Sequence, residues 1–336
     1  MKYRKLADTG LFVSELCFGA MSFGGTGVWK NVGETGQEEA NKLVDYALDN
    51  GINFFDTANV YSKGLSEEIL GKALGAKRKD IILATKVRGR MGEGMNDTGL
   101  SRVHIRKQVE ESLKRLNTDY IDLYQIHGVD AHTSAEDVMR TLNDLVREGK
   151  VRYIGISNHM AWQIMKMNAT AESYGWEKFK SLQAYYSIAS RDLEREVQPL
   201  LKDQNMALLV WSPLAGGFLT GKYKPNKSPK GKARRIDFDF PPIDKEKAFD
   251  IIDKIEKIAQ HHNASIAQIA LAWLLHKEMV TSIIIGTRNL NQLQENLKVS
   301  DIILSDKELL ELDEISKLKP EYPGWMTERM QDDRNR

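Results

Sequence analysis

The chain has 336 residues, of which 41% are hydrophobic and 28% are charged, and its formal net charge is +1. This length suits one large α/β barrel, and the charge gives no electrostatic reason to expect nucleic acid as a partner. The single cysteine, Cys17, excludes internal disulfides and a multi-cysteine metal site. No signal-peptide core or bilayer-length apolar run is present, so the sequence predicts a cytoplasmic protein with no membrane partner.

The first predicted element is a hairpin. Asp8-Thr9-Gly10 is a turn signal between the apolar segments 3–6 and 11–13. After it, short apolar runs without alternation predict buried strands. These runs are 16–19, 52–55, 81–85, 121–126, 151–156, 181–186, 208–211 and 282–285.

Helical patterns lie between and after these strands. Apolar residues at helical spacing and capping residues predict helices over 38–50, from Ser66 onward, over 101–116, from the capping box at Ser134, and over 160–174, 245–262, 265–277 and 305–318. Because two of these helices precede the eighth strand, one of them is an insertion.

Eight buried strands with intervening helices predict a (β/α)8 TIM barrel with a short N-terminal hairpin and extra helices near the C-terminus. An open doubly wound sheet is the alternative, but no G-x-G-x-x-G follows the first strand. No linker divides the chain, so we expect a single domain over 1–336. The tail from about 319 to 336 is expected to be irregular.

Four polar residues end or follow three consecutive predicted strands. Asp56 ends the second strand and Tyr61 follows five residues later, Lys86 ends the third, and His127 ends the fourth. The carboxyl ends of all strands in a parallel barrel lie on one face, so these side chains should converge.

The chemistry of this set suits proton transfer to an oxygen. A phenol has an unperturbed pKa of about 10, and a nearby cation such as Lys86 favours the phenolate. Asp56 can hold Lys86 charged, and His127 can donate to a carbonyl oxygen on which charge develops. The set has no nucleophile suited to acyl transfer and too few clustered ligands for a metal. A Schiff-base role for Lys86 is a weaker hypothesis, because Asp56 would keep the amine charged.

The sequence resembles the aldo-keto reductase family in five motifs: GINFFDTANVY at 51–61, ATK at 84–86, YIDLYQIH at 120–127, VRYIGISN at 151–158 and WSPLAGGFLTGK at 211–222. The resemblance implies a barrel that binds NADPH and reduces a small-molecule aldehyde or ketone. Tyr61 would donate the proton, Lys86 and Asp56 would tune it, and His127 would orient the carbonyl. The resemblance also covers potassium-channel β subunits, so a nucleotide-binding regulatory subunit is the alternative.

Further residues are expected at the cofactor. Gly19 and Ala20 are small enough for a flat ring to approach, although small residues also ease strand packing. By resemblance, Ser157, Asn158 and Gln183 hold the nicotinamide carboxamide and Trp211 stacks on the ring. The segment after Trp211 imitates a Walker A loop, but Tyr223 follows its lysine, which argues against an ATPase. It can still present backbone N–H groups to a pyrophosphate. Its expected cofactor-binding residues are Ser212, Leu214, Gly216, Leu219, Gly221 and Lys222.

Arg288 lies just before a predicted helix that begins near Asn289. A cation there opposes the helix dipole, which suggests that an anion binds between the arginine and the exposed N–H groups. By resemblance the anion is the 2′-phosphate of NADPH. Expected neighbours in this site are Gly286, Thr287, Gln292, Glu295 and Asn296.

The basic stretch 222–235 and its continuation to 242 form either an ordered lid over the cofactor or a solvated loop. Substrate-side candidates are Met21 and Trp29, together with Tyr61 and His127. Met91, Met95, Tyr322 and Trp325 are also expected to rim the mouth of the barrel. The oligomeric state stays open at this point.

Overall fold

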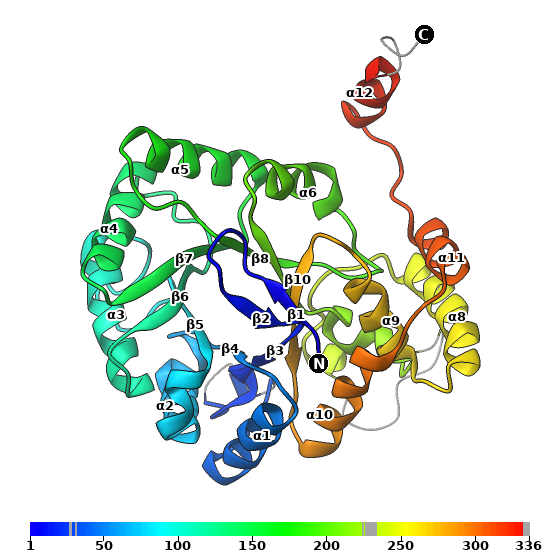
Figure 1. Ribbon diagram of the computed structural model, residues 1–336, viewed down its shortest axis with the longest axis horizontal. Helices are drawn as coiled ribbons and strands as arrows, with labels where there is room; N and C mark the ends of the chain where they lie inside the picture. Colours follow the sequence, from blue (N-terminus) through cyan, green and yellow to red (C-terminus); the bar gives the residue numbers. More distant parts are fainter. Residues whose placement is uncertain (27–28, 31, 224, 226–233, 332–336) are drawn as a thin grey trace.

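The computed structural model describes residues 1–26, 29–30, 32–223, 225 and 234–331. Eight parallel strands close into a barrel in the order β10-β3-β4-β5-β6-β7-β8-β9, which confirms the predicted (β/α)8 architecture (Figure 1). The strands are β3 (Leu16–Gly19), β4 (Phe54–Asp56), β5 (Ile82–Val87), β6 (Ile121–Ile126), β7 (Val151–Ser157), β8 (Ser181–Tyr185), β9 (Ala207–Trp211) and β10 (Val280–Gly286). Helices cover their outer face, so the strands are almost continuously buried.

An outer layer of helices surrounds the barrel in Figure 1. It contains α1 (Gln37–Asp49), α2 (Leu65–Leu74), α3 (Arg102–Leu116), α4 (Ala135–Arg147), α5 (Ala161–Ser173), α6 (Leu193–Asp203) and α10 (Leu290–Leu297). Two of the predicted starts are side-chain caps: the Ser101 hydroxyl accepts from His104 N, and the Ser134 hydroxyl accepts from Asp137 N. Each cap satisfies an amide that the helix itself leaves unbonded.

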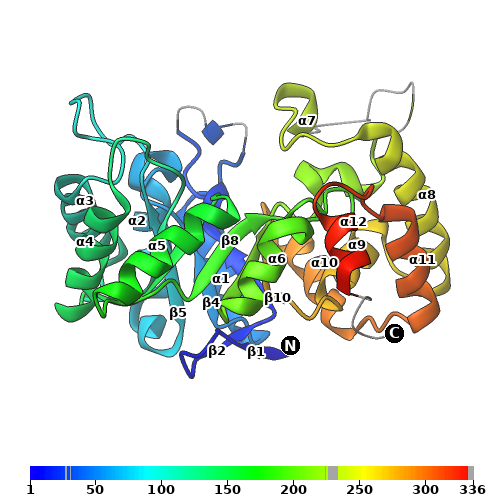
Figure 2. The same cartoon turned by 90° about the horizontal axis from the view of Figure 1, so that it is seen from above.

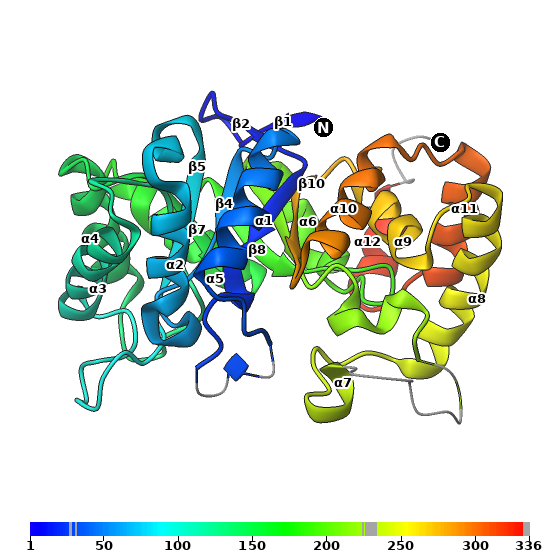
Figure 3. The ribbon, with the colours of Figure 1, turned by 90° about the horizontal axis from the view of Figure 1, so that it is seen from below.

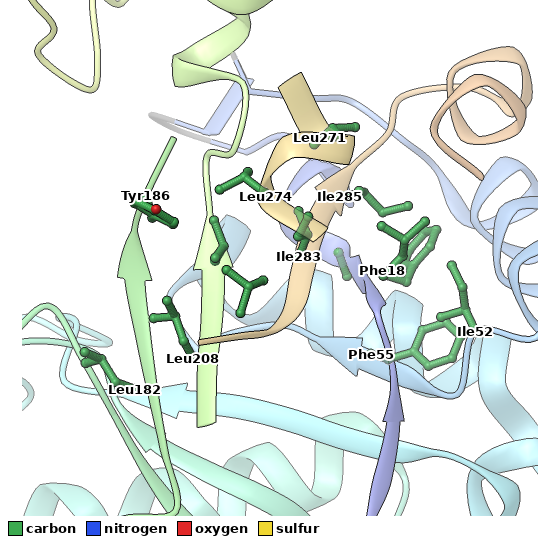
Figure 4. Packing of buried hydrophobic residues seen from close by; sticks show 14 of the residues in the cluster. Phe18, Ile52, Phe55, Leu182, Tyr186, Leu208, Leu271, Leu274, Ile283 and Ile285 are labelled. Carbon is green, nitrogen blue, oxygen red and sulfur yellow. The ribbon is translucent and has the colours of Figure 1, made fainter. Parts of the chain in front are cut away.

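Two helices, α8 (Lys245–His261) and α9 (Ile266–Leu275), lie between β9 and β10, as predicted. Figure 4 shows Leu271 and Leu274 of α9 beside Ile283 and Ile285 of β10. Because α8 has its most extensive packing on α9 and α11 (Asp306–Ser316), whereas α9 packs on β10, α8 is the inserted helix. A four-residue helix, α7 (Arg234–Asp237), was not predicted; most of the preceding basic stretch lies outside the described residues.

The predicted N-terminal hairpin is also present. Strands β1 (Tyr3–Lys5) and β2 (Phe12–Ser14) pair antiparallel. Leu6 and Val13 are fully buried and join Cys17, Phe54 and other inward-facing strand residues in one apolar cluster. Figures 2 and 3 show the hairpin at one end of the barrel and α7 at the other. The hairpin therefore closes the amino-terminal end of the barrel and leaves the reactive chemistry to the opposite end.

The expectation of an irregular tail is wrong for its last described part, because Gly324–Gln331 forms helix α12. Proline cannot continue a helix, so Pro320 and Pro323 interrupt the preceding segment, but the residues after Gly324 contain no further glycine or proline. Figure 1 shows α12 standing away from the barrel. Tyr322 and Trp325 belong to this segment and therefore do not rim the mouth, which corrects the second expectation about the tail.

Candidate active site

Three neighbouring strands bring the four predicted catalytic residues together. Asp56 is the last residue of β4, Lys86 lies in β5, and His127 directly follows β6. The Lys86 Nζ contacts Asp56 Oδ1 at 2.5 Å and the Thr57 carbonyl at 2.8 Å, and it donates to the Tyr61 hydroxyl at 3.3 Å. The His127 and Tyr61 rings meet edge to face with centroids 5.8 Å apart. The sequence-based convergence is therefore seen at atomic distances.

Burial sets the charge states of this group. Lys86 is fully buried, and Asp56 and Tyr61 are 3% and 8% exposed. Desolvation by itself lowers the pKa of Lys86, but the Asp56 charge and the Tyr61 phenol outweigh it and raise the pKa overall. Burial, followed by the positive charges of Lys86 and Arg88, lowers the pKa of His127 to about 3. At neutral pH the site therefore holds a charged lysine and a neutral imidazole with one N–H to donate.

The second oxygen of Asp56 has partners that the sequence analysis missed. Asp56 Oδ2 accepts from Gln125 Nε2 at 3.1 Å and from Gln183 Nε2 at 2.9 Å. Gln125 is fully buried in β6. A glutamine near the carboxyl end of a fully buried strand was the available signal. Gln183 was predicted to bind the carboxamide of a nicotinamide. Its amide nitrogen already donates to the Asp56 carboxylate, so any such contact has to leave this hydrogen bond in place.

The backbone after Tyr61 is strained. Ser62 and Lys63 have left-handed φ angles of 49° and 56°, and Gly64 follows with 96°. Left-handed residues other than glycine cost free energy and persist only where their surroundings hold them. Ser62 Oγ supplies one such restraint because it donates to the Phe23 carbonyl at 3.1 Å. The tyrosine is thus held on a loop that is anchored to the segment after β3.

The same segment carries the predicted substrate-side residues. The Trp29 ring meets the Tyr61 ring edge-on with centroids 5.0 Å apart. Met21 lies in a short 3₁₀ helix, Ala20–Ser22, and is partly exposed. Met91 and Met95 lie in the loop between β5 and α3, where Met95 is 88% exposed. Of these residues, Trp29 has the direct contact with the tyrosine.

Strands β7 and β9 end in a connected set of side chains. Asn158 donates through Nδ2 to the His127 carbonyl at 3.0 Å and accepts through Oδ1 from Trp211 Nε1, also at 3.0 Å. Ser157 Oγ donates to the Gln183 carbonyl at 2.8 Å. Both ends of the Asn158 amide are therefore bonded within the protein, whereas the Ser157 oxygen keeps its capacity to accept.

Trp211 contacts two aromatic rings. The Tyr185 ring centroid is 5.1 Å away and tilted, and the Phe240 ring stacks almost parallel to Trp211 at 5.8 Å and 9°. Sequence reasoning did not identify Phe240, which comes from an aperiodic segment. The ring expected to stack on a nicotinamide thus already has a parallel aromatic partner.

The segment that contains Arg235 and Phe240 packs over the glycine-rich turn after β9. Gly216 has a φ of 65°, and its N–H donates to Ser212 Oγ at 2.9 Å. A Cβ on Gly216 would lie 2.3 Å from the Phe240 carbonyl oxygen, so only glycine fits. The buried Arg235 donates to the Ala215 carbonyl at 2.7 Å. The described part of the 222–242 stretch therefore packs as an ordered segment across the turn.

The remaining residues of the turn differ in internal hydrogen bonding and in exposure. Leu219 donates its N–H to the Leu214 carbonyl, so the amides at the start of the turn are partly used internally. Gly221 has a left-handed φ of 74°, and Lys222 is exposed. A pyrophosphate would therefore meet the later amides and Lys222 rather than the whole run.

Arg288 is exposed beside the start of α10. Its Nε donates to the Val32 carbonyl at 3.0 Å, and its backbone N–H donates to Gln292 Oε1 at 3.0 Å. Asn289 caps the helix by accepting from Gln292 N, as predicted. Arg288 thus links the end of β10 to the segment after β3.

The other expected adenosine-side residues differ in burial. Thr287 is buried and donates to the Asn289 carbonyl at 2.7 Å, while Gly286 is exposed. Glu295 accepts from Gln268 Nε2 at 3.2 Å, and Asn296 is partly exposed.

At the end of β3 the neighbouring strand explains one of the small residues. A Cβ on Gly19 would lie 2.7 Å from Ile284 Cγ2, so packing against β10 alone requires glycine there. Ala20 is fully buried.

Across the described residues, no cluster of three histidine, cysteine or acidic side chains could hold a metal ion, and no helix is long and apolar enough to cross a membrane.

A closed parallel barrel whose mouth holds a buried lysine, a carboxylate, a phenol and a neutral imidazole has the groups that could deliver a proton to an oxygen of a bound molecule. The Aldo/keto reductase family model matches residues 15–317, and the chain belongs to this family. Its members are oxidoreductases that act on small molecules and generally use a nicotinamide cofactor.

Relatives match over nearly the full length. An uncharacterized oxidoreductase of Bacillus subtilis, YrpG, is 39% identical over 96% of this chain and 97% of its own. The versiconal hemiacetal acetate reductase of Aspergillus parasiticus is 35% identical over 96% and 99%. A probable voltage-gated potassium channel subunit beta of Arabidopsis thaliana is 34% identical over 96% and 99%.

Proposed function

We propose that this protein is an NADPH-dependent reductase that converts aldehydes or ketones to alcohols, with Tyr61 as the proton donor. The observation that carries the proposal is the buried Lys86 ammonium, which contacts Asp56 and lies 3.3 Å from the Tyr61 hydroxyl beside the neutral His127. When bound, the reduced nicotinamide supplies the hydride that adds to the carbonyl carbon. The protein must then supply one proton to the carbonyl oxygen.

The four side chains divide this task. Tyr61 gives its proton to the oxygen, and Lys86 stabilises the phenolate that is left. Asp56 keeps Lys86 protonated and directed at the phenol. His127 is neutral, so its N–H can donate to the carbonyl oxygen as negative charge develops without placing a second cation beside Lys86.

The residues at the mouth fit a phosphorylated dinucleotide. The exposed Arg288 lies at the start of α10, where the positive end of the helix dipole favours an anion. Lys222 is exposed after the glycine turn, and Ser157 Oγ at the end of β7 keeps its capacity to accept a hydrogen bond. Arg288 and the α10 amides would hold the 2′-phosphate, Lys222 the pyrophosphate, and Ser157 the carboxamide.

The test is Tyr61→Phe, which removes one hydroxyl and keeps the ring contacts with Trp29 and His127. Loss of a general acid lowers turnover by about a hundredfold to ten-thousandfold. We expect this loss with 4-nitrobenzaldehyde, followed at the NADPH absorbance, while NADPH binding measured by fluorescence stays near normal.

The matched control is Tyr153→Phe. It removes a phenol at the closed end of the barrel, where the hydroxyl donates to the Thr9 carbonyl at 3.1 Å. This variant should lose about 0.5 to 1.5 kcal/mol of stability and no activity. Near-normal turnover in Tyr61→Phe, with the fold verified by circular dichroism, would remove Tyr61 from the mechanism.

A second candidate is a regulatory subunit that binds a nucleotide in the same barrel, and the similarity to the Arabidopsis channel subunit favours it. The two functions differ in turnover. Tight NADPH binding without oxidation across a panel of aromatic and aliphatic carbonyls would support the regulatory role and reject the reductase.

A further inference from the structure

Helix α3 buries a polar stripe in the layer where an outer helix ordinarily presents apolar residues. Gln108, Ser112 and Arg115 are spaced by four and three residues, so they share one face of the helix. Gln108 and Ser112 are 3% and 0% exposed, and the Arg115 side chain is 14% exposed. This face contacts α2 and the segment 57–64, which carries Tyr61.

At the end of the stripe, Arg115 forms an ion pair with Glu67 of α2. Arg115 Nε donates to Glu67 Oε2 at 2.7 Å, and Arg115 Nη2 donates to Ser112 Oγ at 3.3 Å. Glu67 is fully buried, and its other oxygen, Oε1, accepts from the Thr85 hydroxyl at 2.5 Å. One oxygen of the carboxylate is therefore bonded to α3 and the other to β5.

Glu67 connects α2 to the strand of Lys86. Thr85 directly precedes Lys86 in β5, and side chains alternate between the two faces of a strand. The Lys86 side chain points into the barrel, where it contacts Asp56, so the Thr85 hydroxyl points outward to Glu67. The bond between Thr85 and Glu67 thus ties α2 to β5 at the residue next to the lysine.

Arg115 supports the segment of Tyr61. Gly64, with a φ of 96°, ends the strained turn after the tyrosine. A Cβ on Gly64 would lie 2.8 Å from Arg115 Cδ and 2.9 Å from Arg115 Nε, so the arginine packs directly on this turn. Asn59 is held by the same helix, because its Nδ2 donates to Gln108 Oε1 at 3.1 Å. Helix α3 therefore contacts the segment on both sides of the tyrosine.

Stability of the fold does not by itself require an ion pair at this place. Taking two charges out of water is costly, and replacing a buried pair by apolar residues of similar size is often neutral or stabilising. A charge-assisted hydrogen bond adds a defined length and direction, which apolar packing does not. The neighbouring positions of α3 are buried and apolar, namely Ile105, Val109 and Leu116.

We propose that Arg115 and Glu67 are positioning residues for carbonyl reduction, and that their ion pair keeps the Tyr61 hydroxyl within hydrogen-bonding reach of the Lys86 ammonium. This inference rests on the proposed function, because it assigns the pair a role in proton donation by Tyr61. The 3.3 Å contact between Lys86 and Tyr61 joins two different elements, β5 and the segment after β4. Its length therefore depends on how these two elements are held together.

Arg115→Met and the isosteric Glu67→Gln test the proposal, and Arg78→Met is the matched control. Arg78 forms a similarly buried pair with Asp122, with Nη2 and Oδ2 2.8 Å apart, near the amino-terminal ends of β5 and β6. Urea denaturation should show a loss of stability in all three variants, because each leaves a buried charge unpaired. Only Arg115→Met and Glu67→Gln should lower kcat for 4-nitrobenzaldehyde, by about tenfold to a hundredfold, with KM and NADPH affinity within about twofold of wild type.

Two measurements separate positioning from a general loss of stability. The alkaline limb of the pH–rate profile should move upward in Arg115→Met, because a phenol farther from the ammonium is a weaker acid. In the Tyr61→Phe background, Arg115→Met should change the residual turnover by less than about twofold, because no phenol is left to position. An unchanged pH profile together with equal losses of turnover in both backgrounds would show a merely structural role and overturn the proposal.

A titration without substrate distinguishes failure of this inference from failure of the reductase assignment. In protein labelled with carbon-13 at tyrosine Cζ, the Tyr61 resonance is identified by its absence from Tyr61→Phe. It should titrate at a higher pH in Arg115→Met and Glu67→Gln than in wild type and Arg78→Met. A wild type that binds NADPH and reduces no carbonyl would reject the reductase, and the titration would still decide the position of the phenol. An unchanged Tyr61 titration in both variants, or an equal loss of turnover in Arg78→Met, would overturn the proposal.

Discussion

The ion pair between Lys86 and Asp56 makes a quantitative prediction. Lys86→Met removes a fully buried cation and leaves the Asp56 carboxylate and the Thr57 carbonyl without this donor. Breaking a buried pair by removing one partner costs about 3 to 5 kcal/mol. Because Gln125 and Gln183 still donate to Asp56 Oδ2, we expect the lower end, about 3 kcal/mol.

Asp56→Asn in the Lys86→Met background removes the uncompensated charge and keeps the shape of the side chain. The double variant should therefore be less destabilised than the sum of the two single variants, by about 2 kcal/mol. Urea denaturation followed by both tryptophan fluorescence and circular dichroism measures this coupling, provided that the two transitions coincide. Additivity within about 0.5 kcal/mol would refute the assignment of Asp56 as an uncompensated charge in the Lys86→Met variant.

The same variant tests the chemistry. If Lys86 assists the phenol, Lys86→Met should lower turnover and move the alkaline limb of the pH–rate profile upward, because the donor becomes a weaker acid. An unchanged profile in a variant with measurable activity would count against this role.

Three further predictions concern the cofactor, pH and packing. Arg288→Ala should lower NADPH affinity tenfold or more and leave NADH nearly unaffected, and equal losses in titrations of both cofactors would reject the phosphate assignment. The folded-state pKa of His127 lies below its unfolded value of 6.5, so the unfolded state takes up the proton first as the pH is lowered. The free energy of unfolding therefore decreases as the pH drops from 6.5 to about 3. Thermal melting should show that the wild type loses up to about 2 kcal/mol of unfolding free energy between pH 7 and pH 5 and that His127→Gln does not. An equal loss in both proteins would contradict this role of His127. Gly71→Ala should destabilise the protein by about 1 to 3 kcal/mol, because a Cβ would lie 2.6 Å from the Leu116 carbonyl oxygen. Gly36→Ala is the control and should be tolerated, because the space around Gly36 is open. Equal denaturation midpoints for the two variants would disprove this reasoning.

Sequence patterns were sufficient for the barrel and for the four residues at its mouth. Apolar runs without alternation indicate strands covered on both faces, and parallel strands all end on one side. Asp56, Lys86 and His127 lie at or within one residue of the carboxyl ends of strands that are also neighbours along the chain, so their convergence needed no knowledge of packing. The reasoning that placed Tyr61 with them was equally local, because only a short connection separates it from β4.

Contacts between distant segments needed the tertiary structure. Gln125 and Gln183 reach Asp56 across the interior, and which inward side chains meet there depends on strand tilt and stagger. Phe240 reaches Trp211 from a segment without periodicity, and no sequence pattern specifies the path of such a loop. Lys247 and Arg195 bond the connection between α11 and α12 from other helices, and no sequence pattern links these residues to it. Spacing along one element specifies which side chains share a face, whereas the partner of that face is decided by how the whole chain packs.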